Sequence, residues 1–416
     1  MRVLSAIVVP PHLSVSGGAR AGERLSAALT RHCDVTVASM MNAASAQGVL
    51  AGDRPVRRIP VDTWLPPVIP WSKLPNRYST LFYRSALPEI IAQGNYDLVH
   101  LHNPMPGLEL ARAATACQRR GVPYVISTHG FNEVARGNEI YGFDPLRRAV
   151  WSHLVKRPVS RAVRKATGIF ALSPADFGIV RAMGYSGPEP IVVPNGVDPP
   201  AASMPAARAG ALERFGISPD RTPGQVTCLF LANHTPNKGL PVLLKAFGQL
   251  KRPYLLIVGG ETRGDIDYQS HVRSCGEGQR IVVTGRLADD EVSALFRRAD
   301  VFVFPTLADT FPLVVLEAMA HGVAVVASRV GGIPYQLNDL CGTLVAAGDA
   351  AQLASVIDQL ADAPDRLIAM GRNARQRVAA EFTWEAAAAR AYDGYKRALN
   401  RRPAAQTSAV LGAQAI

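Results

Sequence analysis

The stretch from Val301 to Gly322 constrains the fold of this chain more than any other part of the sequence. It begins with four β-branched or aromatic residues, 301–304, which Pro305 closes. Such a run is typical of a short strand buried on both faces. A loop follows, and then an apolar helix that Thr310 is expected to cap and that Gly322 is expected to end in a left-handed conformation. This strand, loop and helix unit is typical of parallel α/β folds.

Two carboxylates in this stretch, Asp309 and Glu317, are eight residues apart. One falls in the loop and the other about two turns into the helix, so both can face the crevice where open α/β sheets bind ligands. The helix is apolar on nearly every side, so Glu317 is expected to be buried, and a buried carboxylate needs a partner. The residues alone leave open whether that partner is a ligand or a structural ion pair.

The same unit recurs along the chain. Residues 3–9 predict a first buried strand, and Gly18 lies in the loop before a helix expected at 20–31. Residues 226–232 predict another strand, followed by a loop that ends at Lys238. Amides at a helix N-terminus and a lysine beside one are typical anion-binding groups, although ordinary turn and surface roles are open alternatives. The pattern predicts an α/β fold class.

The length of 416 residues suits two domains of roughly 200 residues each. A segment rich in proline and alanine, residues 199–210, is expected to link them. Residues 1–199 hold 22 lysines and arginines against 13 aspartates and glutamates, a net charge of +9, whereas the rest of the chain holds 23 against 20, a net charge of +3. The first half therefore carries the basic surface, which favours an anionic partner.

The basic residues concentrate in residues 145–165, which contain seven of them and no acidic residue. Leu146, Val150 and Trp151 fall at helical spacing, and a basic amphipathic helix with a tryptophan is typical of binding to an anionic membrane surface. The alternative is an apolar stripe that packs on the domain core, and Pro158 is expected to limit the helix. No set of stacking aromatic residues accompanies the charges, so nucleic acid is not an expected partner.

The sequence predicts a cytoplasmic protein, attached peripherally to the inner face of the plasma membrane through residues 145–165. Five scattered cysteines without C-x-x-C spacing fit a reducing compartment. The apolar run at 3–9 is too short for a secretory signal, and no run of about 18 apolar residues predicts a membrane span. His100, His102 and His129 lack the carboxylate spacing of a metal motif, so no metal is expected.

The sequence from Asp309 to Gly322, D-T-F-P-L-V-V-L-E-A-M-A-H-G, together with the Gly-Gly-Ile-Pro turn at 331–334, resembles the Glu-x7-Glu motif of retaining, nucleotide-sugar-dependent glycosyltransferases of family 4. The resemblance extends over nearly the whole chain and implies the GT-B fold, in which two Rossmann-like domains face a cleft. It implies an acceptor-side domain at 1–198, a nucleotide-sugar-binding domain at 199–381, a helix at 382–399 that crosses back to the first domain, and a disordered tail at 400–416.

The resemblance also implies roles for individual residues. Glu317 would hold the ribose hydroxyls of the nucleotide, and Lys238 would stabilise the leaving diphosphate. Asp309 would orient the donor sugar, which His129 would face from the other side of the cleft. The further donor-binding positions that the resemblance implies are Gly18, Asn233, His234, Arg286, Leu287, Phe311, Pro312 and Leu313.

The sequence departs from the family pattern at three positions. Asp309 stands where the family has a glutamate, and its shorter arm leaves the donor sugar open. Asn233 stands where an arginine usually binds phosphate, so less positive charge is available to the diphosphate, and Arg286 is a candidate to supply it. Tyr335 stands where an acidic residue usually follows the Gly-Gly-Ile-Pro turn.

We therefore expect a retaining glycosyltransferase that moves a sugar from a nucleotide-diphosphate sugar to a glycan or lipid-linked acceptor, in cell-surface polysaccharide or glycolipid biosynthesis, without a cofactor. One alternative is a nucleotide-sugar epimerase or phosphorylase of the same architecture, which isomerised or phosphorolysed sugar would reveal. The other is a catalytically degenerate, membrane-binding GT-B protein, which would bind no nucleotide saturably. The sugar, the base, the acceptor and the oligomeric state stay open.

Overall fold

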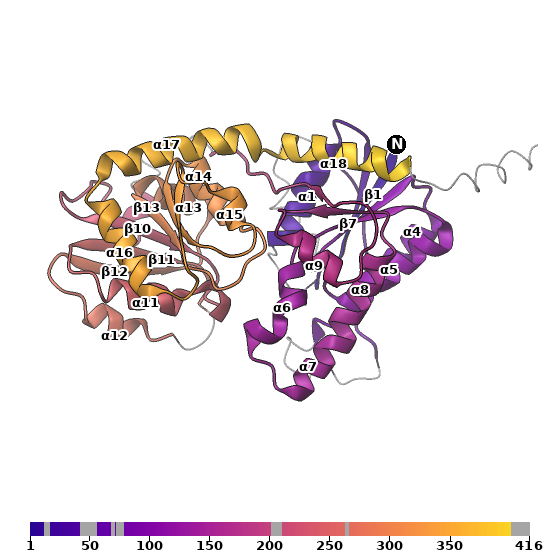
Figure 1. Ribbon diagram of the computed structural model, residues 1–416, viewed down its shortest axis with the longest axis horizontal. Coiled ribbons are helices and arrows are strands. Elements are labelled where there is room, and N and C mark those ends of the chain that lie inside the picture. The colour runs from indigo at the N-terminus through magenta and orange to yellow at the C-terminus, as the bar shows by residue number, and fades with distance from the viewer. Residues whose placement is uncertain are drawn as a thin grey trace, which may run out of the picture.

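The structure is a computed structural model that describes residues 1–11, 17–41, 56–67, 71, 79–200, 210–262 and 266–400. Two separate parallel sheets lie side by side, each covered by helices (Figure 1). Each sheet has its own core of buried apolar side chains. The expected fold class, α/β with two doubly wound sheets, is confirmed.

The first sheet has the strand order β3-β2-β1-β6-β7-β8-β9, and all its strands run parallel. From β1 the chain builds the sheet outward on one side, and it returns to the other side of β1 with β6. The direction of winding therefore reverses between β1 and β6. The strands are β1 (Arg2–Ile7), β2 (Asp34–Ser39), β3 (Arg57–Ile59), β6 (Leu98–His102), β7 (Tyr124–Ser127), β8 (Gly168–Ala171) and β9 (Ile191–Val192).

The helices around the first sheet correct two expectations. Helix α1 begins at Gly17 instead of Arg20, so the glycine pair forms its first turn. Pro158 does not limit its helix, because α7, a π-helical turn η2 and α8 follow one another without a break, and the wider π turn tolerates a residue without an N–H. A short strand, β4, lies in the proline-rich segment 60–75, whose residues 68–70 and 72–75 are outside the described ranges. The remaining elements here are α1 (Gly17–Leu29), β4 (Thr63–Trp64), β5 (Arg84–Ser85), α4 (Leu87–Gln93), α5 (Gly107–Arg120), α6 (Phe131–Tyr141), α7 (Pro145–Trp151), η2 (Ser152–Lys156), α8 (Arg157–Arg164) and α9 (Asp176–Ala182).

The second sheet repeats this plan with the order β12-β11-β10-β13-β14-β15, and it is also entirely parallel. The direction of winding reverses between β10 and β13. Strand β13 covers Val301–Phe304 and all four of its residues are buried, as the sequence predicts. The strands are β10 (Val226–Leu231), β11 (Tyr254–Gly259), β12 (Gln279–Gly285), β13 (Val301–Phe304), β14 (Ala324–Ser328) and β15 (Gly342–Val345).

The helix after β13 begins later than expected. Helix α14 starts at Leu313 with Pro312 as its N-cap, so the prediction that Thr310 caps it is wrong. The carbonyl of Thr310 instead accepts a hydrogen bond from the Gly332 amide at 2.7 Å, which keeps this residue in the loop. Gly322 has φ +74° just after the helix, which confirms its left-handed conformation. The helical elements of this half are η3 (Pro236–Lys238), α11 (Leu240–Phe247), α12 (Tyr268–Arg273), α13 (Asp289–Arg298), α14 (Leu313–Ala320), α15 (Ile333–Gln336), α16 (Ala350–Ala361) and α17 (Pro364–Glu381).

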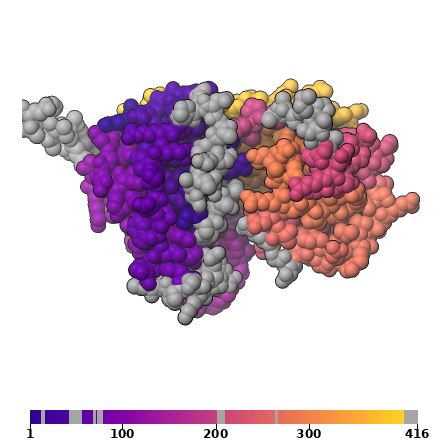
Figure 2. All heavy atoms as spheres, turned by 180° about the vertical axis from the view of Figure 1, so that it is seen from behind, coloured from indigo at the N-terminus to yellow at the C-terminus, as the bar shows by residue number. Residues whose placement is uncertain are grey.

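Helix α18 (Trp384–Leu399) connects the C-terminal part of the chain to the first sheet. It continues the line of α17 and lies over the first half of the molecule (Figure 1), and Figure 2 shows both halves from behind. The buried Tyr395 hydroxyl is 2.8 Å from Nδ1 of the buried His100, on β6. Residues 201–209 and 401–416 lie outside the described ranges. Within those ranges, no helix combines the length and apolar character that crossing a bilayer requires.

Helices α14 and α17 pack closely enough to allow a test at one glycine. A Cβ added to Gly371 on α17 would lie 2.0 Å from the carbonyl oxygen of Gly322, so the two backbones would have to separate. We expect Gly371→Ala to lower the free energy of unfolding by about 1–3 kcal/mol. In the matched control Gly178→Ala, on the exposed side of α9, nothing lies within 4 Å of the added carbon. The control should be neutral or stabilising by about 0.5–1 kcal/mol. Urea unfolding of both variants checks this, and equal stabilities would contradict the close packing.

Candidate active site

A cavity of about 420 Å³ lies between the two halves, at the edge where the strands end and the winding of each sheet reverses. Its volume is in the range of small-molecule sites, and this is the place where open α/β sheets bind ligands. The loops after β10 and β13 line it from the second half. The start of α1 and the turn after β7 line it from the first half.

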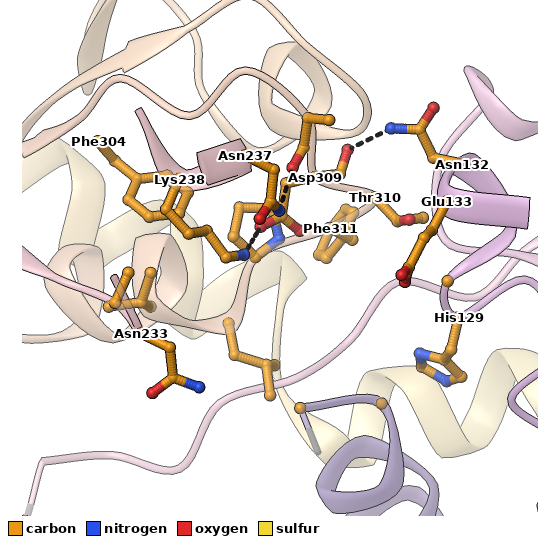
Figure 3. Close-up of a pocket in the computed structure, with 18 of the residues that line it drawn as sticks. His129, Asn132, Glu133, Asn233, Asn237, Lys238, Phe304, Asp309, Thr310 and Phe311 are labelled. Carbon is orange, nitrogen blue, oxygen red and sulfur yellow. Dashed lines mark hydrogen bonds and ion pairs between the residues drawn. The ribbon is translucent and has the colours of Figure 1, made fainter. Parts of the chain in front are cut away.

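Most of the residues expected at a donor site line this one cavity. Lys238 and Glu317, which the sequence leaves 79 positions apart, both line it, and Figure 3 shows Lys238, Asp309, Asn233 and His129 pointing into the same space. The expected site residues in its wall are Gly18, His129, Asn233, Lys238, Asp309, Phe311, Pro312, Leu313 and Glu317.

Lys238 and Asp309 form an ion pair inside the cavity, with Nζ 2.6 Å from Oδ2. Both side chains are largely shielded from solvent, at 25% and 15% exposure. The ammonium also lies 5.7 Å from the centre of the Phe304 ring. This pairing places a cation and a carboxylate side by side, and each offers a charge to a polar ligand.

The loops that carry these two residues are bound to each other by their backbones. The carbonyl of Asn237 accepts hydrogen bonds from the Leu307 amide at 2.7 Å and from the Thr306 hydroxyl at 2.8 Å. Gly239, at φ +74°, passes so close that a Cβ would lie 1.8 Å from the Pro305 carbonyl oxygen. Only glycine fits this approach, so Gly239 is a steric requirement of the site.

Glu317 faces the cavity from α14 with no hydrogen bond to its carboxylate from the described residues. Burial raises the pKa of this carboxyl above its ordinary value, the charge of Arg20 opposes the rise, and Asp289 and Asp198 add to it. Arg20 lies on α1 and lines the same cavity. A shielded carboxylate whose hydrogen-bonding capacity is unused suits a ligand rich in hydroxyl groups.

The segment before α14 presents backbone amides to the cavity. Pro312 lacks an N–H, and the first amides of α14, from Leu313 onward, have no acceptor within the helix. The Gly331-Gly332 turn packs directly against this segment. The Gly332 amide donates a hydrogen bond to the Thr310 carbonyl, and a Cβ on Gly331 would lie 1.9 Å from the Asp309 carbonyl oxygen. The turn therefore fixes the amides that face the ligand space.

The first half contributes a neutral histidine. His129 is 5% exposed, and burial lowers its pKa to about 4, so the ring carries no charge at neutral pH. His100 and His102 share one face of β6, with ring centres 3.8 Å apart. Both are fully buried behind the cavity and do not line it. In the described part of the chain, no group of three metal-ligating side chains has the geometry of a metal site.

Three expected donor residues lie outside the cavity wall. His234 is buried, and its Nδ1 is 2.5 Å from the Tyr268 hydroxyl. Arg286 is exposed at the end of β12, and Leu287 packs toward Gly259. The structure thus does not bring Arg286 to the place where the sequence lacks an arginine.

Two charged residues of the wall are missing from the sequence-based set, namely Arg20 and Glu133. Arg20 comes one turn into α1, beside the glycine pair. Its position in the sequence, just after the expected anion-binding turn, could have predicted a cation at this site. Glu133 comes four residues after His129 and had no motif to mark it. Its place depends on how α6 packs, which local sequence does not encode.

The comparisons with known proteins agree with this geometry in both halves. The family model described as Glycosyltransferase Family 4 matches residues 15–200, and the one described as Glycosyl transferases group 1 matches residues 225–363. D-inositol 3-phosphate glycosyltransferase 2 from Catenulispora acidiphila is 30% identical over 325 residues, which cover 74% of this chain and 72% of that protein.

Solved structures with the same fold align along the whole chain. Sucrose-phosphate synthase from Thermosynechococcus elongatus has a TM-score of 0.69 at 20% identity, covering 97% of this chain and 100% of that one. Anabaena Alr3699/HepE in complex with UDP-glucose has a TM-score of 0.69 at 18% identity, covering 95% and 99%. These likenesses confirm the GT-B fold. With both halves matched and a relative at 30% identity, the chain belongs to glycosyltransferase family 4 and is a glycosyltransferase.

Proposed function

We propose that this glycosyltransferase moves a sugar from a nucleotide-diphosphate sugar to a glycan or lipid-linked acceptor, with retention at the anomeric carbon. The observation that carries the proposal is the shared cavity of Lys238, Asp309 and Glu317, at the edge of the sheet where its winding reverses. The cation suits the phosphates of such a donor. The carboxylate beside it suits the sugar, and the second, shielded carboxylate suits the ribose.

Each group has a distinct part in the proposed reaction. Glu317 binds the ribose hydroxyls, and Lys238 exchanges part of its contact with Asp309 for the diphosphate, whose negative charge grows as the bond to the sugar breaks. Asp309 and the amides that begin α14 hold the sugar in position. Arg20 offers a second cation from the first half. It would compensate for Asn233 in the second half, which stands where the family has an arginine. We assign no protein nucleophile and no metal.

Two of the compared proteins support this assignment. The Anabaena structure is a complex with UDP-glucose, and the relative from Catenulispora acidiphila is named for transfer to D-inositol 3-phosphate. A nucleotide sugar as donor and a hydroxyl group as acceptor are therefore the proposed pair for this chain. Cell-surface polysaccharide or glycolipid synthesis is the proposed setting.

The proposal is tested by incubating the protein with UDP-, GDP- and ADP-sugars and a panel of glycan acceptors. We expect one nucleotide sugar to be consumed, with release of the nucleoside diphosphate and a new glycosidic bond. Proton NMR of the product should show the anomeric configuration of the donor. An inverted configuration would contradict retention, and isomerised or phosphorolysed sugar would indicate a different reaction.

The role of Glu317 gives a second prediction. Glu317→Ala removes a carboxylate that accepts charge-assisted hydrogen bonds, and a loss of about 1.5–3 kcal/mol in total should raise the Kd for the nucleotide about 10- to 100-fold. Calorimetric titration measures this. Glu385→Ala, on the exposed surface of α18, is the control and should leave the Kd unchanged. If the two variants bind nucleotide equally well, Glu317 does not contact the ribose.

We also propose peripheral attachment to the inner face of the plasma membrane through residues 145–165. Trp151 and Val155 pack into the core, so that part of the apolar stripe is structural. Leu146 and Val150 on α7 stay exposed, at 74% and 41%. Arg161, farther along the same helical run, lines a second hollow together with Arg84, Arg112, Arg119 and Arg120. Exposed apolar groups on α7, with basic residues farther along the same helical run, suit an anionic lipid surface.

A vesicle experiment tests this attachment. Leu146→Glu adds a negative charge and removes an apolar contact, so binding to phosphatidylglycerol-containing vesicles should fall about 10-fold. The control is Ile368→Glu, which changes another exposed apolar residue, on α17 in the other half. Sedimentation with vesicles measures binding, and hydrolysis of the donor should be the same in both variants. Equal vesicle binding by both would argue against attachment through α7.

A further inference from the structure

Glu133 faces the proposed donor site from the opposite wall of the cavity. It lies in the first turn of α6, and Figure 3 shows its carboxylate directed into the space between His129 and the Asp309 loop. Burial raises the pKa of this carboxyl, the charge of Lys238 opposes the rise, and that of Asp309 adds to it. Glu133 therefore lies within electrostatic reach of both members of the ion pair in the second half.

The position of this carboxylate is fixed by its neighbours. The Tyr141 hydroxyl donates a short hydrogen bond to Oε1 of Glu133. The Tyr141 ring packs against Phe143 and Trp151, with ring centres 5.5 and 6.4 Å away. Trp151 in turn donates from Nε1 to the Val134 carbonyl on α6 at 3.2 Å. A side chain held in this way pays little entropy when it binds a ligand.

Helix α6 is also joined to the donor side. Asn132, next to Glu133, donates from Nδ2 to the carbonyl of Asp309 at 3.3 Å across the cleft. The carboxylate is therefore held beside the loop proposed to bind the donor sugar.

Glu133 keeps unused capacity for hydrogen bonds. Oε2 accepts none from the described residues, and no lysine or arginine among them pairs with this carboxylate. Neither cation of the cavity wall forms an ion pair with Glu133, since Lys238 pairs with Asp309 and the charge of Arg20 acts on Glu317. An unpaired carboxylate attracts hydroxyl and ammonium groups and repels phosphate.

We propose that Glu133 binds the acceptor, and that the end of the acceptor that enters the cleft is a polyhydroxylated ring, neutral or bearing an amine, without phosphate or carboxylate. This inference rests on the proposed function. Oε2 accepts a hydrogen bond from a hydroxyl or ammonium group of that ring, while Tyr141 holds Oε1. Any phosphate of a lipid-linked acceptor must then lie outside this part of the cleft.

The test compares matched acceptors that differ only in charge. Oligosaccharides ending in glucose, glucosamine or glucose 6-phosphate, and in the corresponding galactose and mannose forms, are offered with the donor that the nucleotide-sugar panel identifies. The wild-type protein should prefer neutral or amino forms over phosphorylated forms by at least about 10-fold in kcat/KM. Glu133→Gln should lower kcat/KM for the preferred form about 10-fold, mainly through KM. The Kd of the donor is measured alongside, and a loss of donor affinity as large as the loss in kcat/KM would contradict a role in acceptor binding.

Two further variants separate recognition from structure. Glu139→Gln, on the same helix but exposed and paired with Arg136, should match the wild type. Glu133→Lys should shift preference toward the phosphorylated forms, which loss of packing alone would not do. Preference of the wild type for phosphorylated forms, transfer to none of the panel, or unchanged acceptor kinetics in Glu133→Gln would each overturn the proposal. A wild-type protein that binds no nucleotide would instead overturn the proposed function itself.

Discussion

The close contact between the loops after β10 and β13 is the constraint on which the site depends. Reversal of the winding between these two strands leaves their carboxyl ends adjacent. The Asn237 carbonyl accepts hydrogen bonds from the Leu307 amide and the Thr306 hydroxyl, which hold the loops together. Gly239 permits an approach that any side chain would block. The ion pair of Lys238 and Asp309 joins these two loops, so the cavity presents a cation and a carboxylate side by side.

Much of this arrangement follows from the sequence. The run at 301–304 is buried on every side, so its strand is predictable from composition alone, and the carboxylates at 309 and 317 follow from it by simple spacing. Lys238 is expected because it ends a loop after the next buried strand in the sheet. These inferences succeed because a strand, its loop and the following helix are encoded by neighbouring residues. The carboxyl ends of parallel strands also meet at one edge of the sheet, so their loops lie close together.

What the sequence does not predict depends on long-range packing. Helix α14 starts at Leu313 and is not capped by Thr310 as predicted, because the Gly332 amide in the Gly331-Gly332 turn binds the Thr310 carbonyl. Leu146 and Trp151 look equivalent in an amphipathic pattern, yet one is exposed and the other is buried against α6. Glu133 has no motif at all, and only the packing of α6 brings it opposite the donor loops. Side chains that face a cleft between domains are hard to predict for this reason.

The central claim is that the loop after β13 and the start of α14 form the donor site. Hydrogen exchange of backbone amides, followed by mass spectrometry with and without a saturating nucleoside diphosphate, tests it directly. We expect slower exchange in residues 309–317 and 233–240 when nucleotide is bound, because the donor contacts amides there and closes the cavity. Unchanged exchange in both segments, with protection elsewhere in the chain, would contradict the account.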